Sequence, residues 1–175
     1  IETWYRNRNR ECVRNLFRKN RHLGRDRHEQ QFDSEHVELP FKVQDSRNGV
    51  VVVDALGSEE IARQVREAIG GVTDQPVRFL VSSTFHGRFT GGNAVYGDAF
   101  SIGHESYRAD LLGLLRDADP AQRAERLPDQ TYRDRVTLHL GGKEIQILHL
   151  GRAHTRGDSI VFVPADRIAY LSEVF

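Results

Sequence analysis

Residues 82–93 read Ser-Ser-Thr-Phe-His-Gly-Arg-Phe-Thr-Gly-Gly-Asn and form a polar segment between two structured stretches of the chain. An apolar run, Val77 to Val81, precedes the segment, and the glycines at 91 and 92 lead into a short helical pattern. This order predicts a buried strand, a loop at its carboxyl end, and the start of a helix. Because open α/β sheets bind ligands at the carboxyl ends of their strands, the loop is the first candidate for a functional site.

The segment resembles the signature loop of the metallo-β-lactamase superfamily, in which a strand ends in His-X-His-X-Asp-His before a glycine-rich turn. His86 matches the second histidine of that pattern. The other three ligand positions differ, because Thr84 stands at the first histidine, Arg88 at the aspartate and Phe89 at the last histidine. The resemblance therefore implies a diverged member of the superfamily with a degenerate metal-binding motif.

Two later segments carry the same resemblance. Residues 151–158, Gly-Arg-Ala-His-Thr-Arg-Gly-Asp, look like the second metal loop of the superfamily, which places His154 as a zinc ligand. Residues 170–175, Tyr-Leu-Ser-Glu-Val-Phe, look like the strand end that carries an aspartate between the two metals. Glu173 holds that position, and Ser172 stands where the family has glycine. Three segments in the right order are more specific than any one of them.

The elements along residues 41–175 fit the fold that this resemblance implies, the αββα four-layer sandwich of the α/β class, incomplete at its carboxyl end. Strands are expected at 50–53, 77–81, 100–103, 136–140, 144–150, 159–163 and 168–171. Ser58 predicts the cap of a helix that ends at the glycines 70 and 71, with a core stripe of Ile61, Val65, Ala68 and Ile69. A second helix is expected to end near Asp117, with a core stripe of Tyr107, Leu111, Leu114 and Leu115. Residues 119–130 are expected to form a connection with one helical turn.

The number of remaining ligands limits the metal content. In this superfamily two zinc ions share a hydroxide that attacks an ester, amide or phosphate. Only His86, His154 and Glu173 remain at matching positions, and three ligands suffice for one catalytic zinc ion with an open site. The guanidinium of Arg88 about 5 Å from a dication would cost roughly 6 to 7 kcal/mol at an effective dielectric near 20. We therefore expect at most one zinc ion and loss of the dinuclear site.

Arg88 is the candidate catalytic residue. The loss of an aspartate and the gain of an arginine at one position suggest that Arg88 replaces the charge of the missing metal. It would pair with Glu173 or bind an anionic ligand and stabilise a developing oxyanion, whereas the alternative is a side chain that points into solvent. The function expected from the resemblance is a hydrolase with a metal-activated water. The alternative is a non-catalytic scaffold that binds a small ligand or a protein partner.

Composition restricts other functions. Lys plus Arg and Asp plus Glu balance at 25 each, and the positive charge is concentrated in residues 1–28, which carry a net charge of +6 within the Arg-rich leader, residues 1–40. Binding of nucleic acid through this leader is a weak third hypothesis. A single Cys12 excludes an internal disulfide, and the sequence shows no membrane span and no secretory pattern, so a cytoplasmic protein is expected. The chain lacks methionine, starts at Ile1 and stops after a strand pattern, which suggests a piece of a longer product.

The other histidines are expected to be structural. His104 follows a strand, where its ring is expected to be hydrogen-bonded, and the alternative is a replacement ligand that swings toward the site. His139 is expected on the solvent side of a strand, and His149 is expected in the core with its ring nitrogens satisfied. Asp158 is expected to fix its own loop beside the metal ligands.

Overall fold

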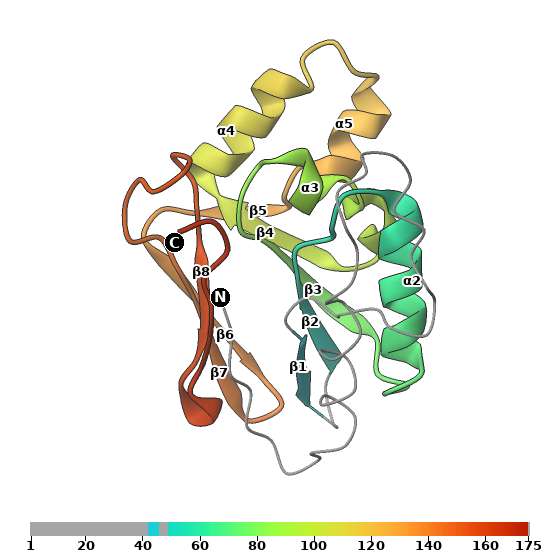
Figure 1. The fold of residues 1–175 in the computed structure, drawn as a ribbon, viewed down its shortest axis with the longest axis vertical. Helices are drawn as coiled ribbons and strands as arrows, with labels where there is room; N and C mark the ends of the chain where they lie inside the picture. Colours follow the sequence, from blue (N-terminus) through green and yellow to red (C-terminus); the bar gives the residue numbers. More distant parts are fainter. Residues whose placement is uncertain (1–41, 46–48, 175) are drawn as a thin grey trace, which may run out of the picture. The chain divides into compact units, whose positions relative to one another are not determined.

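The computed structural model describes residues 42–45 and 49–174, and Figure 1 shows the ribbon. The Arg-rich leader, the boundary proposed at residue 40 and the nucleic-acid hypothesis that depends on the leader lie outside the described residues. These three predictions therefore stay predictions.

The first sheet has five strands in the order β1-β2-β3-β4-β5. The strands are β1 (Lys42–Asp45), β2 (Gly49–Val53), β3 (Val77–Ser82), β4 (Phe100–His104) and β5 (Gln130–Tyr132). β1 runs antiparallel to β2, whereas each strand from β2 to β5 runs parallel to its neighbour. The carboxyl ends of four strands therefore lie at one edge of the sheet, and the polar segment 82–93 starts at that edge, as expected.

The second sheet is antiparallel throughout, in the order β6-β7-β8-β9. Its strands are β6 (Arg135–Leu140), β7 (Lys143–Leu148), β8 (Ile160–Val163) and β9 (Ile168–Tyr170). Gly141 and Gly142 join β6 to β7 with φ values of 59° and 77°. Two successive positive φ angles give the hairpin turn that matches strand twist, and only glycine adopts them without strain, so the predicted hairpin is confirmed.

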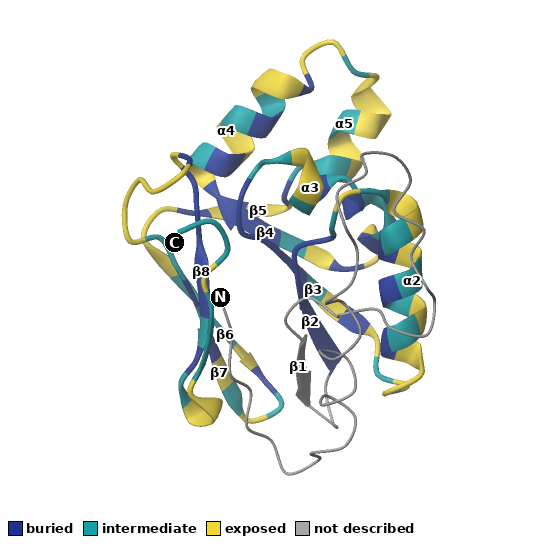
Figure 2. Ribbon diagram, viewed as in Figure 1, coloured by how far each residue is buried: buried dark blue, intermediate teal, exposed yellow. Residues whose placement is uncertain are grey.

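The two sheets share one apolar core. The core cluster takes Val51, Val53, Val81 and Ile102 from the first sheet and Leu140, Ile145, Ile147, Val161 and Val163 from the second. All five residues of β2 are buried, which Figure 2 shows as a continuous dark ribbon, because helices cover the other face of this sheet. Burying each valine or isoleucine side chain contributes about 1.5–3 kcal/mol, so the β-branched run at Val50–Val53 is a main source of the fold's stability.

The helices lie on the outer face of the first sheet (Figure 1). They are α2 (Glu59–Gly70), α3 (Gly87–Thr90), α4 (Glu105–Leu114) and α5 (Pro120–Arg126), with 3-10 turns at η1 (Asn93–Tyr96) and η2 (Pro164–Asp166). Ser58 caps α2 by accepting a hydrogen bond from the Ile61 N–H at 3.3 Å, as the sequence predicts. Layers of helix, sheet and sheet are thus present, and within the described ranges no helix covers the outer face of the second sheet. No described helix is both long and apolar enough to cross a membrane.

Two details of the predicted helices were wrong. The buried face of α2 consists of Ala62, Val65 and Ile69, whereas Ile61 and Ala68 are only partly buried because each lies one position to the side of that face. The connection 119–130 contains a seven-residue helix, α5, and then the first residue of β5. Asp119 caps α5, and Pro120 occupies its first turn, where proline favours a helix start rather than ending one.

Candidate metal centre

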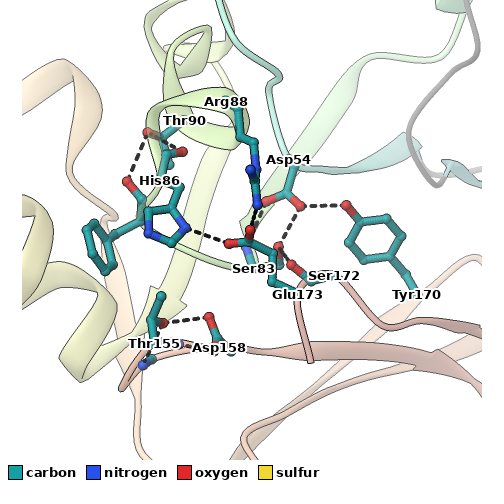
Figure 3. A network of polar contacts seen from close by, with 12 residues as sticks. Asp54, Ser83, His86, Arg88, Thr90, Thr155, Asp158, Tyr170, Ser172 and Glu173 are labelled. Atoms are coloured by element: carbon teal, nitrogen blue, oxygen red, sulfur yellow. Dashed lines mark hydrogen bonds and ion pairs between the residues drawn. The ribbon is translucent and has the colours of Figure 1, made fainter. Parts of the chain in front are cut away.

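Three loops meet at the carboxyl edge of the first sheet, and Figure 3 shows their side chains. The first follows β3, the second joins β7 to β8, and the third follows β9. A backbone hydrogen bond of 2.8 Å from the Ser159 N–H to the Ser83 carbonyl ties the end of β3 to the start of β8. The two sheets are therefore held in register where the loops converge.

His86 and Glu173 form the centre of the group. His86 precedes α3 in an extended conformation, which turns its ring toward the loop after β9. The His86 Nδ1 atom lies 2.6 Å from the Glu173 Oε2 atom, and the Glu173 side chain is only 8% exposed. A carboxylate so thoroughly removed from water requires charged or hydrogen-bonded partners.

Arg88 supplies the second partner of Glu173. Its guanidinium forms an ion pair with the Glu173 Oε1 atom, and the guanidinium carbon lies 5.2 Å from the centre of the Phe89 ring. The predicted pair of Arg88 with Glu173 is thus present, although the Arg88 side chain is 68% exposed. Phe89, which the resemblance aligns with a histidine of the family motif, supports the arginine through a cation–π contact.

His154 completes a group whose ligand atoms converge. His86, His154 and Glu173 each offer one ligand atom, and these atoms lie within 4.8 Å of one another. Two ligands of a tetrahedral zinc ion lie about 3.4 Å apart when each is about 2.1 Å from the metal. Small movements of side chains would therefore suffice, and two imidazoles with one carboxylate match a known type of catalytic zinc site. The donor set fits one zinc ion.

The loop that carries His154 is fixed by its own hydrogen bonds. Asp158 accepts from both the N–H and the hydroxyl of Thr155, each at 2.5 Å, and both residues are buried. A Cβ at Gly157 would lie 2.3 Å from the Tyr107 nitrogen, so the loop packs against α4 at a distance that only glycine allows. Asp158 fixes the loop as predicted, and His154 itself remains exposed.

A buried carboxylate, Asp54, supports the loop of Glu173 from below. It accepts hydrogen bonds from the Ser83 N–H at 2.8 Å, the Ser83 hydroxyl at 2.5 Å and the Tyr170 hydroxyl at 2.8 Å. The Ser83 and Ser172 hydroxyls lie 2.5 Å apart, so the network reaches the residue next to Glu173. Burial raises the pKa of Asp54 to about 6, although the hydrogen bonds from Ser83 and Tyr170 lower it.

Two residues of this network have left-handed backbone conformations. Asp54 has φ 61°, and Ser172 has φ 51°. Serine carries a steric cost in this region that glycine does not. The resemblance drew attention to Ser172 in the place of a glycine, and its backbone retains the conformation that glycine would adopt freely. The Ser83 contact is the compensating feature at this position.

Comparisons with known proteins agree with this geometry at the level of the fold. No protein-family model matches the chain, and no curated protein matches it. A solved structure of a metallo-beta-lactamase from Pontibacter korlensis superposes with a TM-score of 0.58 and 21% sequence identity over 71% of this chain. This chain has the metallo-β-lactamase fold. It covers 54% of the length of that protein, and the likeness concerns the fold alone.

Thr84, Arg88 and Phe89 are the three residues at which the sequence was expected to differ from the family's motif. Thr84 is fully buried, and its hydroxyl oxygen has no hydrogen-bond partner among the described residues. Arg88 pairs with Glu173, and Phe89 lies beneath the arginine. The three substituted positions thus hold a hydroxyl, a cation and an apolar ring, and none of them adds a strong zinc ligand.

A pocket of about 410 Å³ opens beside the group, and both His86 and His154 line it. Its volume falls within the range of about 300–1,000 Å³ that small-molecule sites occupy. The pocket therefore gives a small ligand access to the two imidazoles.

The remaining described histidines are structural, as expected. His104 donates from Nε2 to the Arg133 carbonyl at 2.8 Å and accepts at Nδ1 from the Ser106 N–H at 3.1 Å, which makes it the cap of α4. Its ring stacks on His149 at 3.8 Å between centroids, and His149 is partly buried with Nδ1 bonded to the Asp158 carbonyl at 2.9 Å. Burial, followed by the charge of His149, lowers the pKa of His104. His139 is exposed.

Sequence reasoning missed Asp54 and Tyr170. Asp54 directly follows the buried run Val50–Val53 at the same edge of the sheet as the loop after β3, and that placement was the available signal. Tyr170 was assigned only to a strand. Its hydroxyl donates a hydrogen bond to Asp54, which lies 116 residues earlier in the chain. No local pattern in the sequence announces a pairing over such a separation.

Proposed function

We propose that this chain binds one zinc ion through His86, His154 and Glu173 and acts as a hydrolase of an ester, amide or phosphate. The observation that carries the proposal is the convergence of three ligand atoms, from three separate loops, to within 4.8 Å of one another. The metallo-β-lactamase fold supports it, because a protein named for that zinc-hydrolase family shares the architecture.

The residues of the site would divide the work. When bound, zinc acts as a Lewis acid and lowers the pKa of its water to about 7, which supplies a nucleophile at neutral pH. His86 and His154 would each offer an imidazole nitrogen to the ion at the edge of the pocket, and Glu173 would contribute a carboxylate oxygen. Arg88 has five N–H donors in a planar fork, more than one carboxylate oxygen uses. Its remaining donors would stabilise negative charge on a substrate oxygen at the rim.

Arg88 also supports the limit of one ion. Its guanidinium is bound to Glu173, the residue at the position that bridges two metals in the superfamily. A second dication near this cation would meet strong repulsion, because the arginine cannot lose its proton at any ordinary pH. The proposed dinuclear loss thus follows from charge as well as from the missing ligands.

The alternative function, a scaffold without catalysis, is favoured by one observation. Both carboxylate oxygens of Glu173 already have partners, Oε2 with His86 and Oε1 with Arg88. A carboxylate whose oxygens already have protein partners is stable in the buried site without a metal ion. In that case the pocket would bind a ligand or a partner and transform nothing.

Measurement of zinc content separates the two functions. The purified full chain is dialysed against zinc and then against metal-free buffer, and zinc is measured by elemental analysis beside hydrolysis of ester, amide and phosphate substrates. We expect about one zinc ion per chain, and loss of both zinc and hydrolysis in Glu173→Gln. The matched control is His139→Ala, an exposed histidine on the second sheet. A zinc content near zero in the wild type would remove the hydrolase and leave the scaffold.

A further inference from the structure

The pocket beside the ligand group has one apolar wall. Leu114, at the end of α4, lines the pocket and is 65% exposed, so its expected place in the core stripe of that helix was wrong. Phe85 lines the same pocket and packs against the cluster formed by Tyr107, Leu111 and Leu115. An exposed leucine beside a partly buried phenyl ring provides a surface that an apolar ligand group would cover.

A second wall of the pocket is cationic. Arg152 and Arg156, both from the loop 151–158, line the pocket. Arg156 forms an ion pair with Asp110, the one acidic residue among the described lining residues. Arg152 has no ion pair or hydrogen bond within the described part of the chain, so its charge is not compensated there. The same pocket therefore carries an available positive charge and an apolar surface.

We propose that this pocket takes organic anions, namely a phosphate or carboxylate that carries an apolar group of about the size of a phenyl ring. Arg152 binds the anion, and Leu114 with Phe85 covers the apolar group. The substrate class rests on the proposed function, because the bound molecule would lie against His86 and His154. The recognition itself depends only on residues outside the ligand group.

The pairing of charge and apolar surface makes a specific demand on the ligand. Inorganic phosphate can use only the arginine, and benzyl alcohol can use only the apolar wall. A molecule with both features gains from both walls at once, since the two contacts share one loss of translational freedom. Phenyl phosphate should therefore bind more tightly than either fragment.

Calorimetric titration of the full chain tests the proposal after its metal has been removed by chelation and dialysis. The probes are phenyl phosphate, 3-phenylpropanoate, inorganic phosphate and benzyl alcohol. We expect phenyl phosphate to bind at least about tenfold more tightly than inorganic phosphate and benzyl alcohol. The comparison with 3-phenylpropanoate decides between phosphate and carboxylate as the preferred anion.

Variants assign the effect to the two walls. Arg152→Gln should reduce the affinity for phenyl phosphate about tenfold and leave the affinity for benzyl alcohol unchanged. Leu114→Asn should reduce the affinity for both compounds. The control is Arg63→Gln, an exposed arginine on α2 that should change nothing. Equal affinity for phenyl phosphate and inorganic phosphate, or an unchanged affinity in Arg152→Gln, would overturn the proposal. Tight binding of phenyl phosphate by a chain that takes up no zinc would uphold this proposal and refute only the proposed function.

Discussion

Replacing Asp54 by asparagine is expected to stabilise the protein at neutral pH. The carboxyl is fully buried, and burial raises its pKa from 3.8 to about 6 despite three hydrogen bonds. Asparagine has the same shape and tolerates the φ of 61° at this position. Its carbonyl can accept from the Ser83 N–H, and its amide can donate to the hydroxyl of Ser83 or Tyr170. The variant thus keeps the network without the buried charge.

The magnitude follows from the shift in pKa. A shift of about two units corresponds to about 3 kcal/mol between the two protonation states. Because the pKa of Asp54 is higher in the folded state, the folded protein binds more protons than the unfolded protein. The stability that this proton binding contributes is fully present below about pH 4. It is lost as the pH rises through 6. The stability of Asp54→Asn relative to wild type should therefore rise by about 3 kcal/mol between pH 4 and pH 7.

Urea denaturation of both proteins at intervals from pH 4 to pH 7.5 measures this difference, and the other titrating groups cancel in the comparison. Asp98→Asn is the control, because the Arg66 hydrogen bond lowers the pKa of Asp98 below its ordinary value of 3.8. Its stability relative to wild type should therefore change mainly below pH 4 and stay nearly flat over the measured range. A relative stability of Asp54→Asn that stays flat or declines from pH 4 to pH 7 would refute the reasoning about the buried charge.

Three further predictions concern the site and its support. Arg88→Gln should raise the affinity for zinc about 10- to 100-fold, measured in competition with a chromophoric chelator, because the substitution removes a cation from Glu173. The exposure of Arg88 reduces the Coulomb energy to this range. An unchanged affinity would contradict the role assigned to the charge of Arg88. Thr84→Val should leave the melting temperature unchanged or raise it, because the hydroxyl that it removes is buried without a partner among the described residues, and a clear loss of stability would show that the hydroxyl is satisfied. The folded state favours neutral His104, because its pKa is lowered, so the stability of the wild type should decrease as the pH falls through about 6.5. The melting temperature of His104→Gln should decrease less than that of the wild type between pH 7 and pH 5. Equal decreases would contradict this role of His104.

The parts of the fold that could be predicted are mostly those that depend on residues close together in the sequence. Ser58 at the start of α2 and the glycines at 141 and 142 act through their own backbone geometry, so their effects can be read from neighbours in sequence. The β-branched run at Val50–Val53 likewise needs burial on both faces, whatever covers it. The segment of α5 was expected to form only one helical turn, whereas Asp119 and Pro120 together favour a helix start and the helix runs for seven residues.

Only part of the site could be predicted, because its residues lie far apart in the sequence. His86, His154 and Glu173 were found because each lies in a segment that resembles a known motif. Their meeting in space, and the ion pair of Arg88 with Glu173, agree with that expectation. The contacts of Asp54 with Ser83 and Tyr170 connect residues that no motif marks, and only the packing of two sheets brings them together.

The central claim, that one metal ion belongs to the group of His86, His154 and Glu173, is tested most directly by anomalous X-ray diffraction at the zinc absorption edge, on crystals grown with zinc. We predict a single anomalous peak within about 2.3 Å of ligand atoms from all three residues. A map without a peak at these residues, or with two peaks beside Glu173, would contradict the account.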